Sequence, residues 1–312
     1  MKDNKTTVNY LMPYHVPVLF TETINALQVK PDGVYVDCTF GGGGHSRGII
    51  EKLGSEGKLI AFDQDKDAEQ NLPADDRIIF VPNNFRHLQR FLRLNGYVKV
   101  DGVIADLGVS SHQFDEGERG FSTRFEGPLD MRMDQRQENN ASTILKKYTE
   151  QQLHKLFEQY GEVTNSKTLA RQIVQQRNNN PLQTIAHLKA IISPVVKGNP
   201  NKYLAQVFQA LRIEVNDEMG ALKEMLEQLP AVLKPGGRVA VITFHSLEDR
   251  LVKSFFKSGA FNEQDENPLL PEERQNSLKI ITKKPIIAGN EEVKRNPRSR
   301  SAKLRVAEKV EE

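Results

Sequence analysis

Residues 34–46 read Val34-Tyr35-Val36-Asp37-Cys38-Thr39-Phe40-Gly41-Gly42-Gly43-Gly44-His45-Ser46, and this stretch decides the fold. It joins an apolar run typical of a buried strand to a helix-like run through four consecutive glycines. Glycine is needed where a backbone turns with positive φ and where a ligand approaches without a Cβ in the way. A strand, a glycine turn and a helix start also place bare amides at the positive end of a helix. The stretch therefore predicts a loop that binds a nucleotide-type cofactor.

A carboxylate follows this loop at the spacing expected for an adenosine ligand. The next apolar run, 58–62, ends in Asp63, ~20 residues beyond the glycines, where the dinucleotide fingerprint places an acid for the ribose hydroxyls. The fingerprint is only partly met, because Gly41 and Gly43 fit its first two positions while Ser46 occupies the third. No Gly-Lys-Ser/Thr follows, which excludes a phosphate loop. The pattern favours an adenosine cofactor without a pyrophosphate, and S-adenosylmethionine is the commonest of these.

Two other interpretations of the loop stay open on these residues alone. A nicotinamide-dependent oxidoreductase would use the same loop and the same Asp63, but it predicts a glycine at position 46. A glycine-rich turn that binds nothing would explain the glycines as well, and the correctly spaced Asp63 argues against it. Titration with each cofactor separates the first alternative from a methyltransferase.

Length and composition indicate a soluble cytoplasmic enzyme. With 312 residues the chain can bury an α/β core and carry a second module. Its only cysteine, Cys38, excludes an internal disulfide framework and a cysteine-rich zinc site. No apolar run approaches the ~18 residues that span a bilayer, and residues 1–14 contain no apolar core of a secretion signal. We therefore expect neither secretion nor membrane insertion.

The charges of the whole chain nearly balance, but basic residues are concentrated in one segment. The net charge is +2, which predicts no general affinity for polyanions. Between Lys279 and Arg305, however, nine basic residues stand against two acidic ones, a local charge of +7. Such a run can contact phosphates, although lysines on an edge strand also discourage aggregation. Both interpretations of the run are kept.

The order of the apolar runs predicts an α/β fold with a parallel sheet. Strand-like and helix-like runs alternate up to Asp106, which is the pattern of a βαβ series. A fifth strand, 238–244, comes much later, after the turn residues 234–237 and a helix-like run around Leu222. The earlier strands are predicted at 34–37, 58–62, 77–81 and 100–106, and the helices between them at 45–53, 66–72 and 86–95.

The segment between the two halves of this sheet is too long for a loop. It has helical periodicity of its own, and we predict an inserted helical domain at 113–212. Residues 1–112 and 213–312 would then form one discontinuous cofactor-binding domain. The chain closes with a helix at 248–256, a strand near 279–282 and an alternating strand at 302–306. Two such terminal strands favour a methyltransferase sheet with an antiparallel edge strand over a dehydrogenase.

Six ordered blocks make this chain similar to one family. The match runs from His15 to Arg305, and the chain resembles the bacterial 16S rRNA cytosine-N4 methyltransferases, the RsmH or MraW family. That family resemblance implies a Rossmann-like class I methyltransferase that uses S-adenosylmethionine to methylate N4 of a cytidine in the decoding region of 16S rRNA. The blocks are Asp37-Cys38-Thr39-Phe40-Gly41-Gly42-Gly43-Gly44-His45-Ser46, Asp106-Leu107-Gly108-Val109-Ser110-Ser111, Glu118-Arg119-Gly120-Phe121-Ser122, Leu129-Asp130-Met131-Arg132-Met133-Asp134, Phe208-Gln209-Ala210-Leu211-Arg212-Ile213 and Phe244-His245-Ser246-Leu247-Glu248-Asp249-Arg250.

The resemblance also implies which residues hold the cofactor. Asp63 would accept the ribose hydroxyls, Phe85 would pack on the adenine, and Asp106 at the end of the fourth strand would face the crevice. For Phe85 the alternative is an ordinary core aromatic, and for Asp106 a turn residue after a strand. The implied cofactor contacts are Gly43, Gly44, His45, Asp63, Phe85, Asp106 and Gln113.

The group that accepts the N4 proton stays open in the sequence. The lone pair of the cytosine amine is delocalised into the ring, so an acceptor for an N4 hydrogen would help to localise it. Many amino-methyltransferases place an Asp/Asn-Pro-Pro-aromatic motif at the end of the fourth strand, and this chain has no Pro-Pro there. No metal is required, because the sulfonium already activates the methyl group. The candidates are Asp106, Asp130, Ser110 and His245.

RNA recognition would need a splayed-out cytosine held by stacking and polar contacts. Aromatic and basic residues that could supply them are interleaved just after the fourth strand, although a packed lid with surface arginines explains them too. The implied partner is 16S rRNA within the small ribosomal subunit, whereas the oligomeric state is not determined by the sequence. A noncatalytic RNA-binding protein of ribosome assembly is the remaining alternative. The interleaved residues are Phe114, Phe121 and Phe125 with Arg119, Arg124, Arg132 and Arg136.

Overall fold

A computed structural model describes residues 17–261 and 276–310. Residues 1–14, analysed above for a secretion signal, and His15, where the resemblance begins, lie outside the described residues. One eight-stranded sheet organises the rest, in the order β3-β2-β1-β4-β5-β8-β6, with β7 also paired to β8. Its strands are β1 (Val34–Asp37), β2 (Lys58–Phe62), β3 (Ile78–Val81), β4 (Val100–Asp106), β5 (Leu233–Thr243), β6 (Leu278–Ile280), β7 (Ile286–Ile287) and β8 (Lys303–Lys309).

The strand order places a ligand crevice beside β1. Strands β3, β2, β1, β4 and β5 are parallel, and the chain crosses from one side of β1 to the other between β3 and β4. In open α/β sheets ligands bind at such a reversal, outside the carboxyl ends of the strands. The glycine loop follows β1 directly, so it lies at this crevice. The antiparallel strand predicted for the edge is β8, which lies one place inside the short strand β6.

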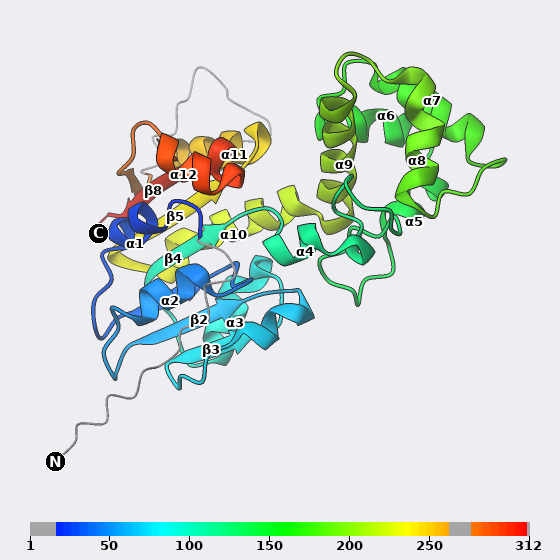
Figure 1. Cartoon of the computed structure of the whole chain (residues 1–312). Helices are drawn as coiled ribbons and strands as arrows, with labels where there is room; N and C mark the ends of the chain where they lie inside the picture. The colour runs from blue at the N-terminus through cyan, green and yellow to red at the C-terminus, as the bar shows by residue number, and fades with distance from the viewer. Residues whose placement is uncertain (1–16, 262–275, 311–312) are drawn as a thin grey trace, which may run out of the picture.

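Helices cover both faces of the sheet, which confirms the Rossmann-like α/β fold (Figure 1). One apolar cluster joins the sheet to α1 (Phe20–Leu27) and α2 (Gly44–Ile50). A second cluster joins it to α3 (Leu88–Leu94), α10 (Glu218–Val232) and α11 (Ser246–Ser258). In the described part of the chain, no helix is both long enough and apolar enough to cross a membrane.

A third apolar cluster belongs to the helices between β4 and β5. It draws its buried side chains from the segment between Phe121 and Val215, independently of the sheet. Figure 1 shows these helices, in green, set apart from the sheet beyond α4 (Ser111–Asp115). They are α5 (Ala141–Lys147), α6 (Glu150–Gln159), α7 (Ser166–Gln176), α8 (Ile185–Ile192) and α9 (Pro200–Asn216).

Two elements differ from the sequence-based expectation. The helix predicted at 66–72 is a 3₁₀ helix, η1 (Lys66–Asn71). Leu72 is extended because it precedes Pro73, and a proline disfavours the helical conformation in the residue before it. The turn predicted at 234–237 is a bulge inside β5, where the pairing with β4 shifts between Val100 and Gly102.

Candidate active site

The glycine loop is closely packed against the protein on one side and open on the other. Gly43 has φ 71°, and a Cβ there would lie 2.9 Å from the Phe40 ring. A Cβ on Gly44 would collide with Pro17, whereas one on Gly42 would meet nothing within 4 Å. Gly43 and Gly44 are therefore required by the protein's own packing. The open side at Gly42 leaves room for a ligand.

The serine at the third fingerprint position has a specific partner. Ser46 is buried in α2, and its hydroxyl donates to Asp37 Oδ2 at 2.7 Å. Asp37 ends β1, and its other oxygen accepts the Thr39 amide at 3.0 Å. Burial raises the pKa of Asp37, although the bonds from Ser46 and Thr39 oppose the rise. A glycine at position 46 would leave Asp37 Oδ2 without this donor, so the serine replaces the missing glycine for a physical reason.

Replacing Ser46 by alanine is expected to destabilise the protein by about 1–3 kcal/mol, because the buried Asp37 oxygen loses its donor. Chemical denaturation measures the change in free energy of unfolding. Ser55→Ala is the matched control, since Ser55 is exposed and bonds only its neighbour Glu56. Equal stability of Ser46→Ala and Ser55→Ala would contradict the assigned role of Ser46.

Asp63 follows β2 and already holds two backbone amides. Its Oδ2 accepts from Gly41 at 2.7 Å and its Oδ1 accepts from Asp65 at 2.8 Å. Burial raises the pKa of Asp63 to about 7, against the effect of these two bonds. A carboxylate oxygen has more than one lone pair, so Asp63 can still accept the hydroxyls of a ribose. Its bond to Gly41 also ties the end of β2 to the glycine loop.

His45 and Asp106 meet at the base of the crevice. His45 is buried in α2, with Nε2 3.1 Å from the Val18 carbonyl and Nδ1 3.6 Å from Asp106 Oδ2. Burial lowers the pKa of His45 to about 4, so the ring is neutral and Nε2 carries the proton given to Val18. The carboxyl of Asp106, which ends β4, is therefore not neutralised by His45.

Asp106 has an uncommitted oxygen. Its Oδ1 is buried and has no hydrogen-bond partner within the described residues. Burial, with the Asp37 and Glu248 carboxylates nearby, raises its pKa well above the usual range. Its amide donates to Thr39 Oγ1 at 2.7 Å, which fixes the strand end against the glycine loop. A buried acceptor without a donor is costly and points to a ligand that supplies one.

Ser110 and Gln113 hold each other. Ser110 caps α4 by accepting the Gln113 amide, while Gln113 Oε1 accepts the Ser110 amide, both at 3.1 Å. Gln113 Nε2 donates to Asp65 Oδ2 at 2.6 Å. A Cβ on Gly41 would lie 3.8 Å from Ser110 Cβ, so this cap borders the glycine loop. Both polar atoms of the Gln113 side chain thus have partners within the protein, which makes this residue a support of the crevice wall.

Arg119 is a buried residue to which the sequence assigned only a surface role. Its guanidinium pairs with Asp65 at 2.8 Å and with Asp67 at 2.9 Å, both just beyond β2. It also donates to the Arg132 and Met133 carbonyls. These bonds fasten the lid segment, residues 113–136, to the carboxyl edge of the sheet. The Asp63-Gln64-Asp65 cluster was the only sequence indication of such an anchor.

Asp130 and Phe85 both contact other parts of the protein, and these contacts limit the roles that they can have. Both Asp130 oxygens accept from the Arg132 guanidinium, at 2.8 and 2.7 Å, so this carboxylate is paired within the lid. Phe85 begins η2 (Phe85–His87) after Asn84 and is partly buried against the second apolar cluster. Phe85 is thus in part the core aromatic that the sequence offered as its alternative.

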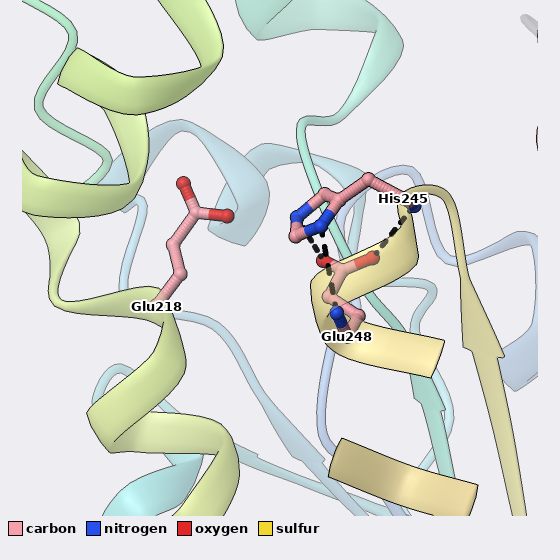
Figure 2. Close-up of side chains that lie close together, drawn as sticks. All are labelled: Glu218, His245 and Glu248. Atoms are coloured by element: carbon pink, nitrogen blue, oxygen red, sulfur yellow. Dashed lines mark hydrogen bonds and ion pairs between the residues drawn. The ribbon is translucent and has the colours of Figure 1, made fainter. Parts of the chain in front are cut away.

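His245 belongs to a charged group at the junction of β5, α10 and α11. Figure 2 shows it with Glu248, whose Oε1 lies 3.2 Å from His245 Nε2, and with Glu218 nearby. The ligand atoms of these three residues lie within 4.8 Å of one another, a spacing that a metal ion could use. Glu218, however, accepts from Nε and Nη2 of the Arg212 guanidinium, at 2.7 and 2.9 Å. Glu248 Oε2 accepts the Phe244 amide at 2.8 Å, so both glutamates already have partners within the protein.

The structure brings most of the predicted site residues to one edge. The glycine loop, His45, Asp63, Asp106 and Ser110 border the same crevice. Asp130 lies in the lid, and His245 follows β5 beyond Asp106. Sequence reasoning gave no positioning role to several residues that hold the site in place. These are Asp37, Thr39, Ser46, Asp65, Arg119 and Arg212.

Comparison with known proteins bears on this site. The model of the MraW methylase family matches residues 12–310. Ribosomal RNA small subunit methyltransferase H of Parabacteroides distasonis is 54% identical over 299 residues, which cover 95% of this chain and 98% of that protein. The protein of the same name from Christiangramia forsetii is 52% identical over 306 residues, covering 96% and 99%. A solved rRNA methylase from Streptococcus thermophilus is 11% identical with a TM-score of 0.40, covering 93% and 95%.

Proposed function

The chain belongs to the MraW methylase family, and on this premise we propose that it methylates N4 of a cytidine in the decoding region of 16S rRNA. It is a methyltransferase that uses S-adenosylmethionine, so the nicotinamide alternative is set aside. One observation carries the proposal for the reacting site. Among the residues that the structure describes, no donor reaches the buried Oδ1 of Asp106, at the carboxyl end of β4 beside the crevice.

The residues of the crevice fit the methyl donor. Asp37, Asp63 and Asp106 are carboxyl groups with raised pKa values, and a cationic sulfonium nearby would favour their ionised forms. We propose that the backbone of residues 43–45 faces the methionine part and that Asp63 accepts the ribose hydroxyls. Phe85 would contribute its partly exposed ring to the adenine, and Gln113 would act through Asp65.

Asp106 is the first candidate for the proton acceptor. The bound cofactor supplies a methyl group that is already electrophilic. The protein must then hold the amine in line and accept one N4 hydrogen, which returns the lone pair to the nitrogen. Burial and the neighbouring carboxylates make Asp106 a stronger base than an exposed aspartate. Ser110 and His245 are engaged in helix caps, so we assign them to positioning.

Asp130 is assigned to the lid because its carboxylate holds Arg132, which in turn donates to the Gln135 and Gln137 carbonyls. Replacing Asp130 by alanine is expected to leave S-adenosylmethionine affinity unchanged and to lower turnover by about tenfold, since the lid positions the RNA. Calorimetry and methyl-transfer rates separate the two effects. Asp134→Ala is the matched control, because Asp134 pairs with Arg136 in the same local geometry on a more exposed surface. Equal losses in both variants would contradict a specific role for Asp130.

The RNA substrate is tested directly by methyl transfer. Small subunits from a strain that lacks the modification, and separately naked 16S rRNA, are incubated with the protein and labelled S-adenosylmethionine. The labelled nucleotide is then mapped. We expect label on N4 of one cytidine in the decoding region. No transfer to either substrate would favour the noncatalytic assembly protein, and label elsewhere would overturn the proposed target.

The segment 113–212, which holds α5 to α8 and most of α9, is proposed as the substrate-recognition domain. The separate apolar cluster of these helices supports an independent unit, and the Arg119 anchor supports a lid that reaches the crevice. Association with the assembled small subunit is part of the same proposal.

A further inference from the structure

An aromatic ring at the mouth of the crevice is contacted by two arginines from distant parts of the chain. The guanidinium carbon of Arg124, in the lid, lies 5.0 Å from the centre of the Phe114 ring. That of Arg298, in η5 (Pro297–Ser301), lies 5.2 Å from the same centre. Both arginines also donate to Asp115 Oδ1, at 3.0 and 2.9 Å. The basic C-terminal run therefore meets the lid at Phe114.

These residues surround a hollow that is open on the surface. Its volume is about 430 Å³, enough for a phosphodiester with part of its sugar. Arg295, at the end of α12 (Asn290–Arg295), brings a third guanidinium to it. The lining residues, called the arginine hollow below, are Phe114, Arg124, Arg295, Asn296, Pro297 and Arg298.

The charges of the arginine hollow are not balanced by its own residues. Three guanidiniums line it, and Asp115 is the carboxylate that two of them share. Partial burial would raise the pKa of Asp115. The bonds from Arg298 and Arg124 outweigh burial, and the pKa of Asp115 is lowered. The carboxylate is thus ionised at neutral pH, which leaves a net charge of +2 among these four side chains. Those bonds use only Nη2 of each arginine, whereas a guanidinium has five N–H donors.

We propose that the arginine hollow binds a backbone phosphate of the RNA next to the target nucleotide. This inference rests on the proposed function and adds to it a contact outside the cofactor crevice. Phe114 lies in α4, directly after the Ser110 cap that borders the glycine loop, so the hollow adjoins the crevice. Planar guanidiniums match phosphate oxygens in two-point contacts. Arg124 of the lid and the two arginines Arg295 and Arg298 of the basic C-terminal run thereby line one surface.

Arg295→Gln tests the inference with little risk to folding. Arg295 is exposed, and its Nε donates only to the Glu291 carbonyl one helical turn earlier. Binding of an unmodified 16S rRNA transcript is measured over a range of KCl concentrations. We expect affinity to fall about five- to tenfold at 0.1 M salt, and the slope of log K against log salt to fall by about 0.7–0.9 for one lost phosphate contact. Affinity for S-adenosylmethionine should not change.

Two further variants sharpen the result. Lys52→Gln removes an exposed charge between α2 and the amino end of β2, away from the arginine hollow. This variant should bind RNA like the wild type. Arg298→Lys keeps the charge but removes the fork, so its affinity should lie between those of the wild type and Arg295→Gln.

The outcomes distinguish this inference from the proposed function. If the wild type methylates rRNA while Arg295→Gln keeps both its affinity and its salt slope, the arginine hollow does not bind RNA. If Arg295→Gln binds naked rRNA normally and fails only on assembled subunits, its partner there is a ribosomal protein, and the inference is wrong. If the wild type neither binds nor methylates rRNA, the proposed function itself fails.

Discussion

Replacing Asp106 by alanine is expected to lower turnover by about 100- to 10,000-fold at saturating S-adenosylmethionine and RNA, the range for loss of a general base. The reason is that Oδ1 of Asp106 is buried beside the crevice and has no hydrogen-bond partner within residues 17–261 and 276–310. Single-turnover methyl transfer measures the effect on the chemical step. Asp106→Asn keeps a carbonyl acceptor but cannot take up the proton, so its rate should lie between those of the wild type and Asp106→Ala.

Stability provides the control for this variant. The folded pKa of Asp106 is raised, so ionising its carboxyl costs stability progressively as pH rises through that pKa. Asp106→Ala removes this cost, and thermal unfolding should show its stability gaining on the wild type as pH increases. A loss of activity together with lower stability at every pH would indicate a structural role. Near-wild-type turnover would exclude Asp106 as the proton acceptor.

Replacing Asp63 by alanine is expected to weaken S-adenosylmethionine binding by about 100-fold, because two charge-assisted hydrogen bonds to the ribose are lost. Calorimetry or equilibrium dialysis measures the affinity. Asp76→Ala is the control. Asp76 is exposed just before β3, at the amino ends of the strands, whereas the crevice lies at their carboxyl ends. Equal cofactor affinity in the wild type and Asp63→Ala would refute the ribose assignment.

The pH dependence of cofactor binding follows from the same residue. The pKa of Asp63 is about 7 in the folded protein, so the ionised fraction rises steeply between pH 6 and pH 8. Ribose hydroxyls donate more strongly to the ionised form, and affinity should therefore rise with pH, by up to about tenfold over this interval. In the free protein the sign is opposite: the raised pKa of Asp63 lowers folding stability as pH increases from about 4 through 7. Asp63→Asn should lose the part of each dependence that comes from Asp63.

The cofactor half of the site could be predicted because its information is local. A strand, a turn with Gly43 at positive φ and a helix lie within a few residues of one another, and Asp63 ends the next strand. In a parallel sheet those strand ends must meet at one edge. The strands β1, β2 and β4 accordingly have the bounds that their apolar runs predict.

The catalytic half could not be ranked from the sequence. Asp106, Asp130, Ser110 and His245 all stayed candidates, with His245 the easiest to doubt, because the pattern of residues does not reveal hydrogen-bond partners. The structure separates them by their partners: Arg132 pairs with Asp130, a helix cap uses Ser110, and Glu248 accompanies His245. Asp106 Oδ1 and His245 Nε2 are then the two candidate atoms left buried and without a hydrogen-bond partner in the described part of the chain, and Asp106 is the one of them at the carboxyl end of β4, beside the glycine loop.

By itself the sequence determined the α/β fold, the adenosine-type crevice and the position of its glycine loop, since each depends on spacing along one short stretch of chain. Tertiary structure alone decided why Ser46 replaces a glycine, how Arg119 anchors the lid, and that Arg298 meets Phe114. Arg298 and its partner Asp115 are 183 residues apart in the chain. Contacts between residues so far apart in the chain depend on how the sheet and its helices assemble, and no local pattern encodes them. The four glycines thus predicted where a ligand binds. Only the tertiary structure showed that Gly43 also makes room for Phe40, and Gly44 for Pro17.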